Sequence, residues 1–329
     1  MSDPGAPPDR RAISGILLLD KPEGLSSNAA LQRVKRLLGA RKAGHAGSLD
    51  PLASGMLPIC LGEATKVAGD LTGHHKAYRF EIALGARTAT GDREGAVVER
   101  QPVPALDRAA IERVLARFCG EQWQTPPMYS ALKRAGQPLY RLARAGIEVE
   151  RAPRRIAITR LEITRLEPAA LTAETLALEA HCSKGTYIRV LAEDLARALG
   201  TVGHVSRLRR LWVAPFEKEP MQALEDIESR AGSGAMAPLI EPDRALVGLP
   251  PVGLSAAAAR RLAYGQAVES PDPQLTGRVR CYDEQGRFLG LGEADGAGRV
   301  RPRRMFVLVA QGDQRVECRA SKRQDHESF

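Results

Sequence analysis

The sequence has few aromatic residues and few cysteines. Phe, Trp and Tyr make up 4% of its 329 residues, so few side chains are available to stack on a planar ligand. An odd number of scattered cysteines, with no C-x-x-C pair, argues against a disulfide scaffold and a structural zinc site and fits a reducing cytoplasm. The cysteines are Cys60, Cys119, Cys182, Cys281 and Cys318.

Long hydrophobic runs and glycine-rich nucleotide motifs are also missing. No apolar run approaches the roughly 20 residues that span a bilayer, and residues 1–11 lack the apolar region of a secretory signal. Neither G-x-G-x-x-G nor a Walker loop occurs. We therefore expect a cytoplasmic protein with no membrane partner and no nucleotide cofactor. We also expect no metal site, because four histidines lack ligand spacing with thiol or carboxylate partners: His74, His75, His181 and His204.

Positive charge is in excess. The chain carries 48 Lys and Arg against 39 Asp and Glu, a net charge of +9. A basic surface binds polyanions through release of counterions, so nucleic acid is the leading partner class. An arginine-rich proteome would give the same balance, and composition alone leaves both interpretations open.

The order of patterns along the chain predicts an α+β fold with a largely antiparallel sheet. Apolar runs and alternating stretches that predict strands mix with helical periodicity, as in the helix after Ser26 or Ser27, without regular βαβ alternation. We expect a disordered leader at 1–12 and a disordered tail at 312–329. The pattern weakens from 224 to 247, which predicts a boundary between a larger region (13–247) and a compact module (249–311).

One acid, Asp50, lies in a run of small residues, His45-Ala46-Gly47-Ser48-Leu49-Asp50-Pro51-Leu52-Ala53-Ser54-Gly55. Glycines allow a close backbone approach to a ligand, and Pro51 favours an extended Asp50. For an arbitrary Asp-Pro, a surface turn is the better interpretation. The apolar run from Met56 to Leu61 predicts a buried strand behind this loop.

The whole run from His45 to Gly62 resembles the signature loop of the TruB family of tRNA pseudouridine synthases. Further segments match the same family in the same order, over roughly residues 13 to 216. They are Asp20-Lys21-Pro22, Lys76-Ala77-Tyr78-Arg79-Phe80, Met128-Tyr129-Ser130-Ala131-Leu132-Lys133 and Ser183-Lys184-Gly185-Thr186-Tyr187-Ile188-Arg189.

This resemblance implies a pseudouridine-synthase catalytic domain at 13–247, with a mixed, mainly antiparallel central sheet flanked by helices. Residues 124–150 could form a thumb that folds over RNA. The module at 249–311 resembles a PUA domain, an RNA-binding β pseudo-barrel, although by position and length more than by motif. The cationic run 298–304 could follow phosphates or be a solvated edge strand.

The implied reaction isomerises uridine to pseudouridine at position 55 in the T arm of tRNA, without a cofactor. The resemblance makes Asp50 the nucleophile. It places Arg189 beside it, where a guanidinium would lower the pKa of the acid. It makes Tyr78 the platform for the flipped-out base, with a hydroxyl that could help remove the C5 proton. Without the family, Tyr78 would be interpreted as a core residue and Arg189 as half of a surface ion pair.

Other residues are implied in substrate or RNA binding. Tyr187 and Leu208 would line the base pocket, and His45 would hold the opened RNA loop. Lys21 would support the signature loop or contact RNA. The exposed cations Arg41, Lys42 and Lys133 would meet phosphate, although each could simply be solvated.

The expected partner is the T stem-loop of tRNA, bound by a monomer. Two other functions stay open. The chain could be an RNA-binding or RNA-folding protein with a vestigial acid, or a guide-RNA-dependent relative of the dyskerin type. The bacterial style of the loop argues against the second.

Overall fold

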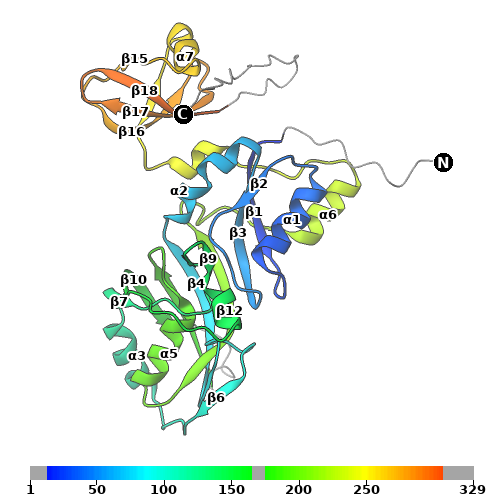
Figure 1. Ribbon diagram of the computed structural model, residues 1–329, viewed down its shortest axis with the longest axis vertical. Helices are drawn as coiled ribbons and strands as arrows, with labels where there is room; N and C mark the ends of the chain where they lie inside the picture. The colour runs from blue at the N-terminus through cyan, green and yellow to red at the C-terminus, as the bar shows by residue number, and fades with distance from the viewer. Residues whose placement is uncertain (1–12, 165–174, 307–329) are drawn as a thin grey trace, which may run out of the picture. The chain divides into compact units, whose positions relative to one another are not determined.

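The structure is a computed structural model that describes residues 13–164 and 175–306. The chain divides into two compact units, Met1–Pro250 and Pro251–Phe329, which Figure 1 colours by position in the sequence. Each unit has its own hydrophobic core. The expected leader (1–12) and tail (312–329) lie outside the described residues.

The first unit is built on a nine-stranded sheet in the order β13-β1-β3-β12-β4-β11-β10-β7, with β2 paired to β3. The β1–β13 and β3–β12 pairs are parallel and the others are antiparallel. The expected α+β class with a mixed central sheet is confirmed. The strands are β1 (Gly15–Lys21), β2 (Ala43–His45), β3 (Ala53–Leu61), β4 (Lys76–Leu84), β7 (Gly120–Gln124), β10 (Arg154–Ile163), β11 (Thr175–Cys182), β12 (Gly203–Val213) and β13 (Gln222–Ala223).

Helices and two small hairpins complete this unit. In Figure 1, α1 and α6 lie side by side near β1, while α3 lies against β10 and α5 against β12. The helices are α1 (Ser27–Leu37), α2 (Ala68–Thr72), α3 (Arg108–Arg117), α4 (Leu139–Arg144), α5 (Ile188–Ala198) and α6 (Leu224–Gly232), with 3₁₀ turns η1 (Gly62–Val67) and η3 (Pro242–Leu246). The hairpins pair β5 (Ala86–Thr88) with β6 (Val97–Arg100), and β8 (Lys133–Arg134) with β9 (Gln137–Pro138).

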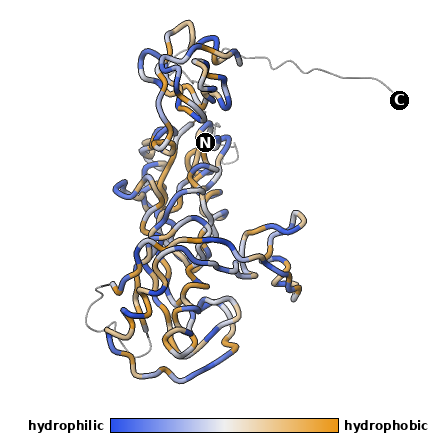
Figure 2. The backbone as a smooth tube through the Cα atoms, turned by 90° about the vertical axis from the view of Figure 1, so that its left-hand side faces the viewer, coloured by the Kyte–Doolittle hydropathy of each residue, from blue (hydrophilic) through white to orange (hydrophobic). Residues whose placement is uncertain are grey.

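The central strands β1 and β3 are buried along nearly their whole length. Leu17 and Leu19 belong to the main core, which also holds buried residues of α1 and α5, while Ile16 and Leu18, which alternate with them along the strand, are equally inaccessible. A strand covered on both faces needs no polar residues, which explains its continuous apolar sequence. Figure 2 shows hydrophobic and hydrophilic stretches alternating along the backbone elsewhere.

Helix boundaries follow local chemistry where the helix has a strong cap. The Ser26 side chain accepts a hydrogen bond from the Ala29 amide and starts α1, as the sequence predicts. Asp107 does the same for α3 through Ala110. The pairing of β10 with β11 shifts register between Ile158 and Arg160.

Residues 224–247, where the sequence pattern weakens, contain a regular helix, α6. Only Leu224 and Ile227 of α6 are buried, so its apolar stripe is too short to show in the sequence. After β3 the chain forms the 3₁₀ turn η1 and becomes α-helical, as α2, only at Ala68.

The second unit has a five-stranded sheet in the order β14-β16-β17-β18-β15 and one helix. Val279, Cys281 and Val300 are fully buried in its core. No helix in the described parts of either unit is both long and apolar enough to span a membrane. The elements are β14 (Pro251–Gly253), α7 (Ala256–Ala263), β15 (Val268–Glu269), β16 (Thr276–Tyr282), β17 (Phe288–Asp295) and β18 (Arg299–Met305).

Candidate active site

The loop at residues 46–52, which we call the Asp50 loop, joins β2 to β3. The Ser27 hydroxyl at the start of α1 accepts a hydrogen bond from the Leu49 amide (2.7 Å) and donates one to its carbonyl (2.9 Å). The Pro51 carbonyl accepts from the Gly24 amide at 2.8 Å. Leu49 and Leu52 are buried on either side of the acid. These contacts fix the backbone, while the Asp50 side chain remains 39% exposed.

The guanidinium of Arg189 holds the Asp50 carboxylate. Arg189 lies in the first turn of α5, its side chain is only 5% exposed, and its Nε is 2.9 Å from Asp50 Oδ2. Its other nitrogens donate to the Thr90 carbonyl (2.8 Å) and the Tyr129 carbonyl (2.6 Å). A guanidinium bound at three points cannot turn away, so the carboxylate it holds has a fixed direction.

A second carboxylate, Asp92, lies 3.7 Å from Arg189 Nε and is almost inaccessible. Asp92 also accepts hydrogen bonds from the Thr90 hydroxyl at 2.6 Å and the Glu94 amide at 3.1 Å. Asp92 therefore approaches the same Arg189 nitrogen as Asp50 and adds a second negative charge beside it.

Burial raises the pKa of Asp50 above its usual range, Arg189 opposes that rise, and Asp92 adds to it. The sequence had led us to expect a lowered pKa from the arginine alone. The direction is reversed because removal from water disfavours the ionised form by more than the guanidinium favours it.

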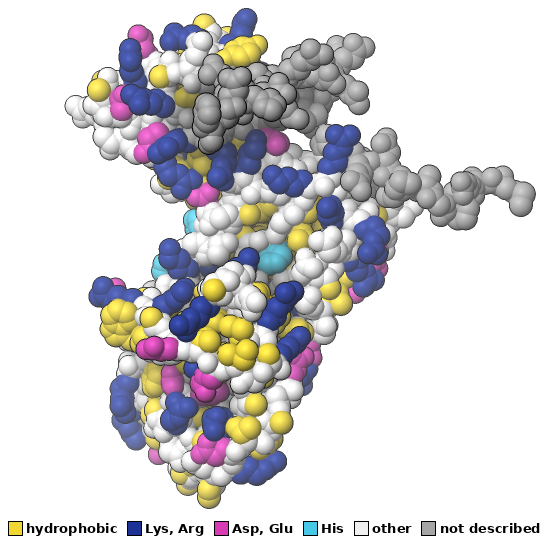
Figure 3. All heavy atoms as spheres, in the orientation of Figure 1, with side chains coloured by type: hydrophobic (Ala, Val, Ile, Leu, Met, Phe, Trp, Pro, Cys, Tyr) yellow, Lys and Arg dark blue, Asp and Glu magenta, His cyan; other side chains and the backbone are white. Residues whose placement is uncertain are grey.

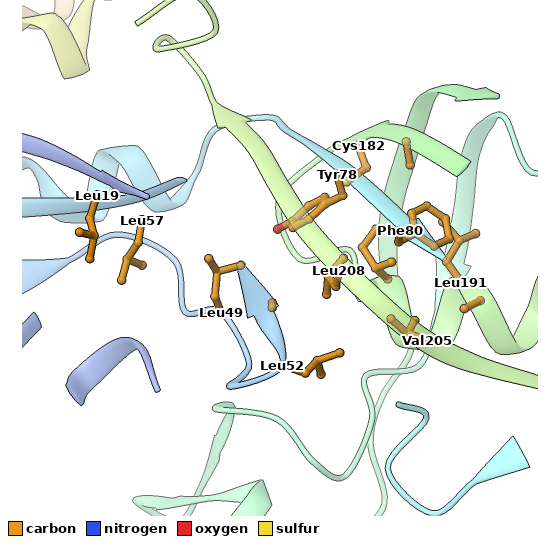
Figure 4. Packing of buried hydrophobic residues seen from close by; sticks show 14 of the residues in the cluster. Leu19, Leu49, Leu52, Leu57, Tyr78, Phe80, Cys182, Leu191, Val205 and Leu208 are labelled. Atoms are coloured by element: carbon orange, nitrogen blue, oxygen red, sulfur yellow. The ribbon is translucent and has the colours of Figure 1, made fainter. Parts of the chain in front are cut away.

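Tyr78 lies on β4, 6% exposed, with its ring in the main core. Its hydroxyl in Figure 4 points away from Phe80 and Cys182, and Leu208 lies beside the ring. Burial raises the pKa of Tyr78, while the positive charge of the nearby Arg210 guanidinium opposes the rise. The phenol is therefore neutral at physiological pH.

A cleft of about 310 Å³ brings five predicted residues together: Asp50, Tyr78, Tyr187, Arg189 and Leu208. Tyr187 is fixed to β7 by a reciprocal pair of hydrogen bonds with the Gln124 side chain, at 2.8 and 3.2 Å. The cleft combines a carboxylate, a guanidinium and two phenols with an apolar wall. That mixture suits a flat, polar-edged ligand attached to a sugar.

The remaining predicted residues lie outside the cleft wall. Lys21 is fully buried, and its ammonium donates to the carbonyls of Pro22 (2.8 Å), Leu25 (2.7 Å) and Pro51 (3.4 Å). Of the two roles expected for Lys21, this position favours support of the Asp50 loop. Burial lowers its pKa from 10.5 to about 8.

His45 and the three surface cations also lie outside the cleft wall. His45 is half-buried on β2, and burial lowers its pKa, with nearby Arg210 adding to the effect. Arg41, Lys42 and Lys133 are exposed, as an RNA contact requires. Figure 3 shows Lys and Arg side chains spread over the visible face of the molecule.

Two cationic residues of the cleft were missed by the sequence analysis. Lys76 and Arg210 line the cleft although they are 7% and 1% exposed. Burial lowers the pKa of Lys76 from 10.5 to about 8, and its ammonium donates to the carbonyls of Thr72 and His74. The sequence did contain a signal for Lys76, because residues two apart on a strand lie on the same face and Tyr78 is two residues away.

A larger hollow, of about 800 Å³, lies between α3 and strands β10 and β11. None of the predicted site residues lines it. Within the described ranges, no group of three or more His, Cys, Asp or Glu residues could hold a metal ion. The cleft with Asp50 therefore remains the candidate active site.

Three family profiles match the chain. Residues 35–188 match the N-terminal domain of the TruB family of pseudouridylate synthases, residues 189–246 a tRNA pseudouridylate synthase B C-terminal domain, and residues 250–306 the C-terminal part of pseudouridine synthase II TruB.

Curated relatives are similar over nearly their full length. A tRNA pseudouridine synthase B of Stutzerimonas stutzeri is 50% identical over 301 residues, which cover 90% of this chain and 97% of the relative. One of Coxiella burnetii is 47% identical over 90% of this chain and 96% of the relative. A chain in the structure of an H/ACA RNP bound to a substrate RNA containing 2′-deoxyuridine has the same fold, with a TM-score of 0.67 and 22% identity over 94% of this chain and 92% of its own.

Proposed function

This chain belongs to the TruB family of pseudouridylate synthases and is a pseudouridine-forming isomerase; from that premise we propose that it converts uridine 55 in the T arm of tRNA to pseudouridine, without a cofactor. The observation that carries the proposal is the 2.9 Å contact between Arg189 and Asp50 in a cleft that Tyr78 also lines.

The reaction breaks the bond from C1′ to N1 of uracil, turns the base, and forms a bond from C1′ to C5. The proton on C5 leaves and N1 gains one, so atoms and electrons balance within the nucleotide and no oxidant is needed. An ionised carboxylate beside the ribose serves either route to bond cleavage. It can attack C1′ as a nucleophile, or it can first remove a proton from C2′.

Asp50 is the group that meets this requirement. Arg189 occupies Asp50 Oδ2, which leaves the other carboxylate oxygen for the ribose. The hydrogen bonds of the loop backbone to Ser27 and Gly24 hold the acid in place before substrate arrives. Such preorganisation lowers the entropic cost of bringing the reacting atoms together.

Tyr78 is proposed to receive the flipped-out uracil on its ring, with Leu208 and Tyr187 closing the pocket. Base flipping is required because the bond that breaks is hidden in a stacked RNA loop. A neutral phenol at the base of the cleft can also relay the proton that leaves C5, by taking it up while its own hydrogen passes to another acceptor.

RNA is proposed to be gripped outside the cleft by exposed cations, with residues 124–150 as a thumb that closes over the stem-loop. Arg41, Lys42 and Lys133 are placed on the surface for phosphate contacts. The second unit is proposed to act as a PUA-like RNA-binding domain, because Arg299 and Arg301 alternate with the buried Val300 along β18 and so point outward.

The experiment is release of tritium from C5-labelled uridine in tRNA by the purified chain. Replacing Asp50→Asn is expected to abolish release while tRNA binding stays within about threefold, because the amide keeps the shape but cannot act as a nucleophile. Asp194→Asn, an exposed acid on α5 paired with Arg197, is the matched control and retains activity.

No release by the intact chain on bare tRNA would contradict the proposal. Release only after addition of a guide RNA would favour the dyskerin-type alternative. Retained assistance of RNA folding by Asp50→Asn would show a second, separate role.

A further inference from the structure

Lys76 and Arg210 are two buried cations of the cleft to which the proposed function gives no role. Their exposed fractions are 7% and 1%, and both line the cleft together with Asp50 and Tyr78. Removing a cation from water is unfavourable unless hydrogen bonds or an opposite charge replace the lost hydration. The partners of the two cations therefore show what their positions require.

The ammonium of Lys76 is held by the chain just before it. It donates to the carbonyl of His74 at 2.7 Å and to that of Thr72 at 3.2 Å, and these two contacts use two of its three N–H donors. Burial lowers the pKa of Lys76 from 10.5 to about 8, and the nearby guanidinium of Arg210 adds to the fall. Lys76 therefore stays mainly protonated at pH 7.

The guanidinium of Arg210 is tied to two other elements of the cleft. Its Nε donates to the Met56 carbonyl on β3 at 2.7 Å, and its Nη2 donates to the Gly47 carbonyl of the Asp50 loop at 2.9 Å. A Cβ on Gly47 would lie 3.3 Å from Arg210 Nη1 and 3.6 Å from Lys76 Cε. The two cationic side chains therefore converge on the same glycine, at the start of the Asp50 loop.

The positive charge of this pair is not cancelled by the cleft. Among the described residues that line the cleft, Asp50 is the only acid, and its Oδ2 already lies 2.9 Å from the Nε of Arg189. Backbone carbonyls hold a cation in place but carry no net charge. Because like charges repel strongly in a buried site, a negative charge that arises beside Lys76 and Arg210 would be stabilised there.

Both cations lie beside Tyr78, the proposed platform for the base. Arg210 is directly opposite Tyr78 in the antiparallel pairing of β12 with β4, a position in which Cβ atoms are about 5 Å apart. Lys76 lies two residues before Tyr78 on β4, on the same face and roughly 7 Å along the strand. A base on the ring, with Leu208 as its apolar neighbour (Figure 4), would therefore lie close to two positive charges.

The proposed reaction moves a negative charge from Asp50 to the base. If the carboxylate attacks C1′, it becomes a neutral ester, and the electron pair of the C1′–N1 bond leaves with uracil. If it first takes the proton from C2′, it becomes a neutral acid, and the same electron pair leaves with uracil as a C1′–C2′ double bond forms. On either route the detached base is an anion whose charge is spread over N1, O2 and O4. When C5 of this anion bonds to C1′, the charge returns to Asp50.

We propose that Lys76 and Arg210 stabilise the detached uracil anion, so that the cleft favours the state in which the negative charge has left Asp50. This inference rests on the proposed function, because it requires the uridine to lie on Tyr78. Interactions that are strong only with the charged base lower the barrier without tightening the binding of uridine. Fixed charges in a buried site are an effective form of such stabilisation.

The test varies both the charge of the residue and the acidity of the leaving base. Lys76→Met and Arg210→Met each remove one positive charge, whereas Lys76→Arg and Arg210→Lys keep it. Each variant acts on tRNA that carries uridine or 5-fluorouridine at the target position. Fluorine withdraws electrons from the ring, so the 5-fluorouracil anion needs less stabilisation by the protein. Single-turnover loss of the starting nucleoside measures cleavage of the C1′–N1 bond with both substrates.

Matched controls come from the same two strands. Arg79→Met on β4 removes a 49% exposed arginine that pairs with Glu179, and Arg207→Met on β12 removes a 73% exposed arginine that pairs with Glu81. Both are expected to leave the cleavage rate within about twofold with either substrate.

Each of the variants Lys76→Met and Arg210→Met is expected to slow cleavage of uridine about a hundredfold, the usual effect of removing one group that stabilises developing charge. The same variants are expected to slow cleavage of 5-fluorouridine only about tenfold, and the charge-keeping variants to lose about tenfold or less with uridine. Affinity for tRNA is expected to stay within about threefold, because the anion forms only during the reaction. Both substrates are compared on one preparation, so partial unfolding cancels in the ratio of the two losses.

Equal losses with the two substrates, or unchanged rates in both methionine variants, would overturn the proposal. Equal losses together with weaker binding of tRNA would instead assign the two cations to a phosphate of the RNA. Should Arg210→Met not fold, Arg210→Gln, whose amide can still donate to a carbonyl, supplies the same ratio. Absence of cleavage of either substrate by the unaltered chain would contradict the proposed function itself.

Discussion

At the scale of single residues, the site is a network of charges more than a lone acid. The Nε of Arg189 lies near two carboxylates, 2.9 Å from Asp50 Oδ2 and 3.7 Å from Asp92 Oδ2. Burial raises the pKa of Asp50, and the guanidinium limits the rise. The arginine therefore decides how much of the acid is ionised as well as where it points.

This balance predicts a pH dependence. The proposed reaction needs ionised Asp50, so kcat/KM is expected to fall as pH decreases through a pKa above the ordinary 3.8. Arg189→Met removes the opposing charge, so the acid limb of the profile is expected to move to higher pH, with kcat lower by about a hundredfold or more. Tritium release measured from pH 4.5 to 8.5 checks both changes.

An acid limb that stays in place in Arg189→Met would contradict this account. Arg197→Met serves as the control, because Arg197 is on the same helix but pairs with the exposed Asp194.

At the scale of elements, two adjacent serines at the start of α1 have separate roles. Ser26 caps the helix through the Ala29 amide at 3.1 Å, whereas Ser27 is buried and ties the helix to Leu49 of the Asp50 loop. The loop therefore takes its rigidity from a helix that lies more than twenty residues earlier in the chain.

The two serines are expected to behave differently when replaced. Ser26→Ala is expected to lower the free energy of unfolding by about 1 kcal/mol, the usual value of an N-cap, with kcat unchanged. Ser27→Ala leaves both polar groups of Leu49 without their partner and is expected to destabilise by about 1–3 kcal/mol and also to lower kcat about tenfold. Urea unfolding and single-turnover rates measure the two effects, and equal kcat values for the two variants would contradict a separate role for Ser27.

At the scale of the whole molecule, the net charge of +9 is divided between the two units. In the first unit several arginines form ion pairs with acidic side chains, for example Arg79 with Glu179 and Arg87 with Glu99. In the second unit β18 carries exposed Arg299 and Arg301. Exposed cations on a strand face are available to polyanions at little desolvation cost.

Charge in the second unit predicts a salt effect on tRNA binding. The double replacement Arg299→Ala with Arg301→Ala is expected to weaken binding at low salt and to reduce the slope of log Kd against log salt by about 1 to 2, with kcat unchanged. Binding titrations at several KCl concentrations measure the slope. The control is Arg108→Ala on α3, which pairs with Glu112, and an unchanged slope in the double variant would exclude this face from RNA contact.

Much of the architecture follows from local sequence. The N-caps of α1 and α3, the apolar runs of β1 and β3 and the bulge in β10 all come from patterns a few residues long, because backbone hydrogen bonding and side-chain period are local. Helix α6 could not be recognised from the sequence pattern because only two of its side chains are buried.

The sequence by itself determined which residue types the proposed chemistry would use: Asp50, Tyr78 and Arg189 stand in recognisable blocks of the chain. Tertiary structure alone decided their surroundings, since Arg210 reaches Gly47 across 163 residues and Arg189 reaches Asp50 across 139. It also decided that the pKa of Asp50 rises. The reason is physical: local patterns govern backbone conformation, whereas the energy of a charge depends on burial and on partners that only folding brings near.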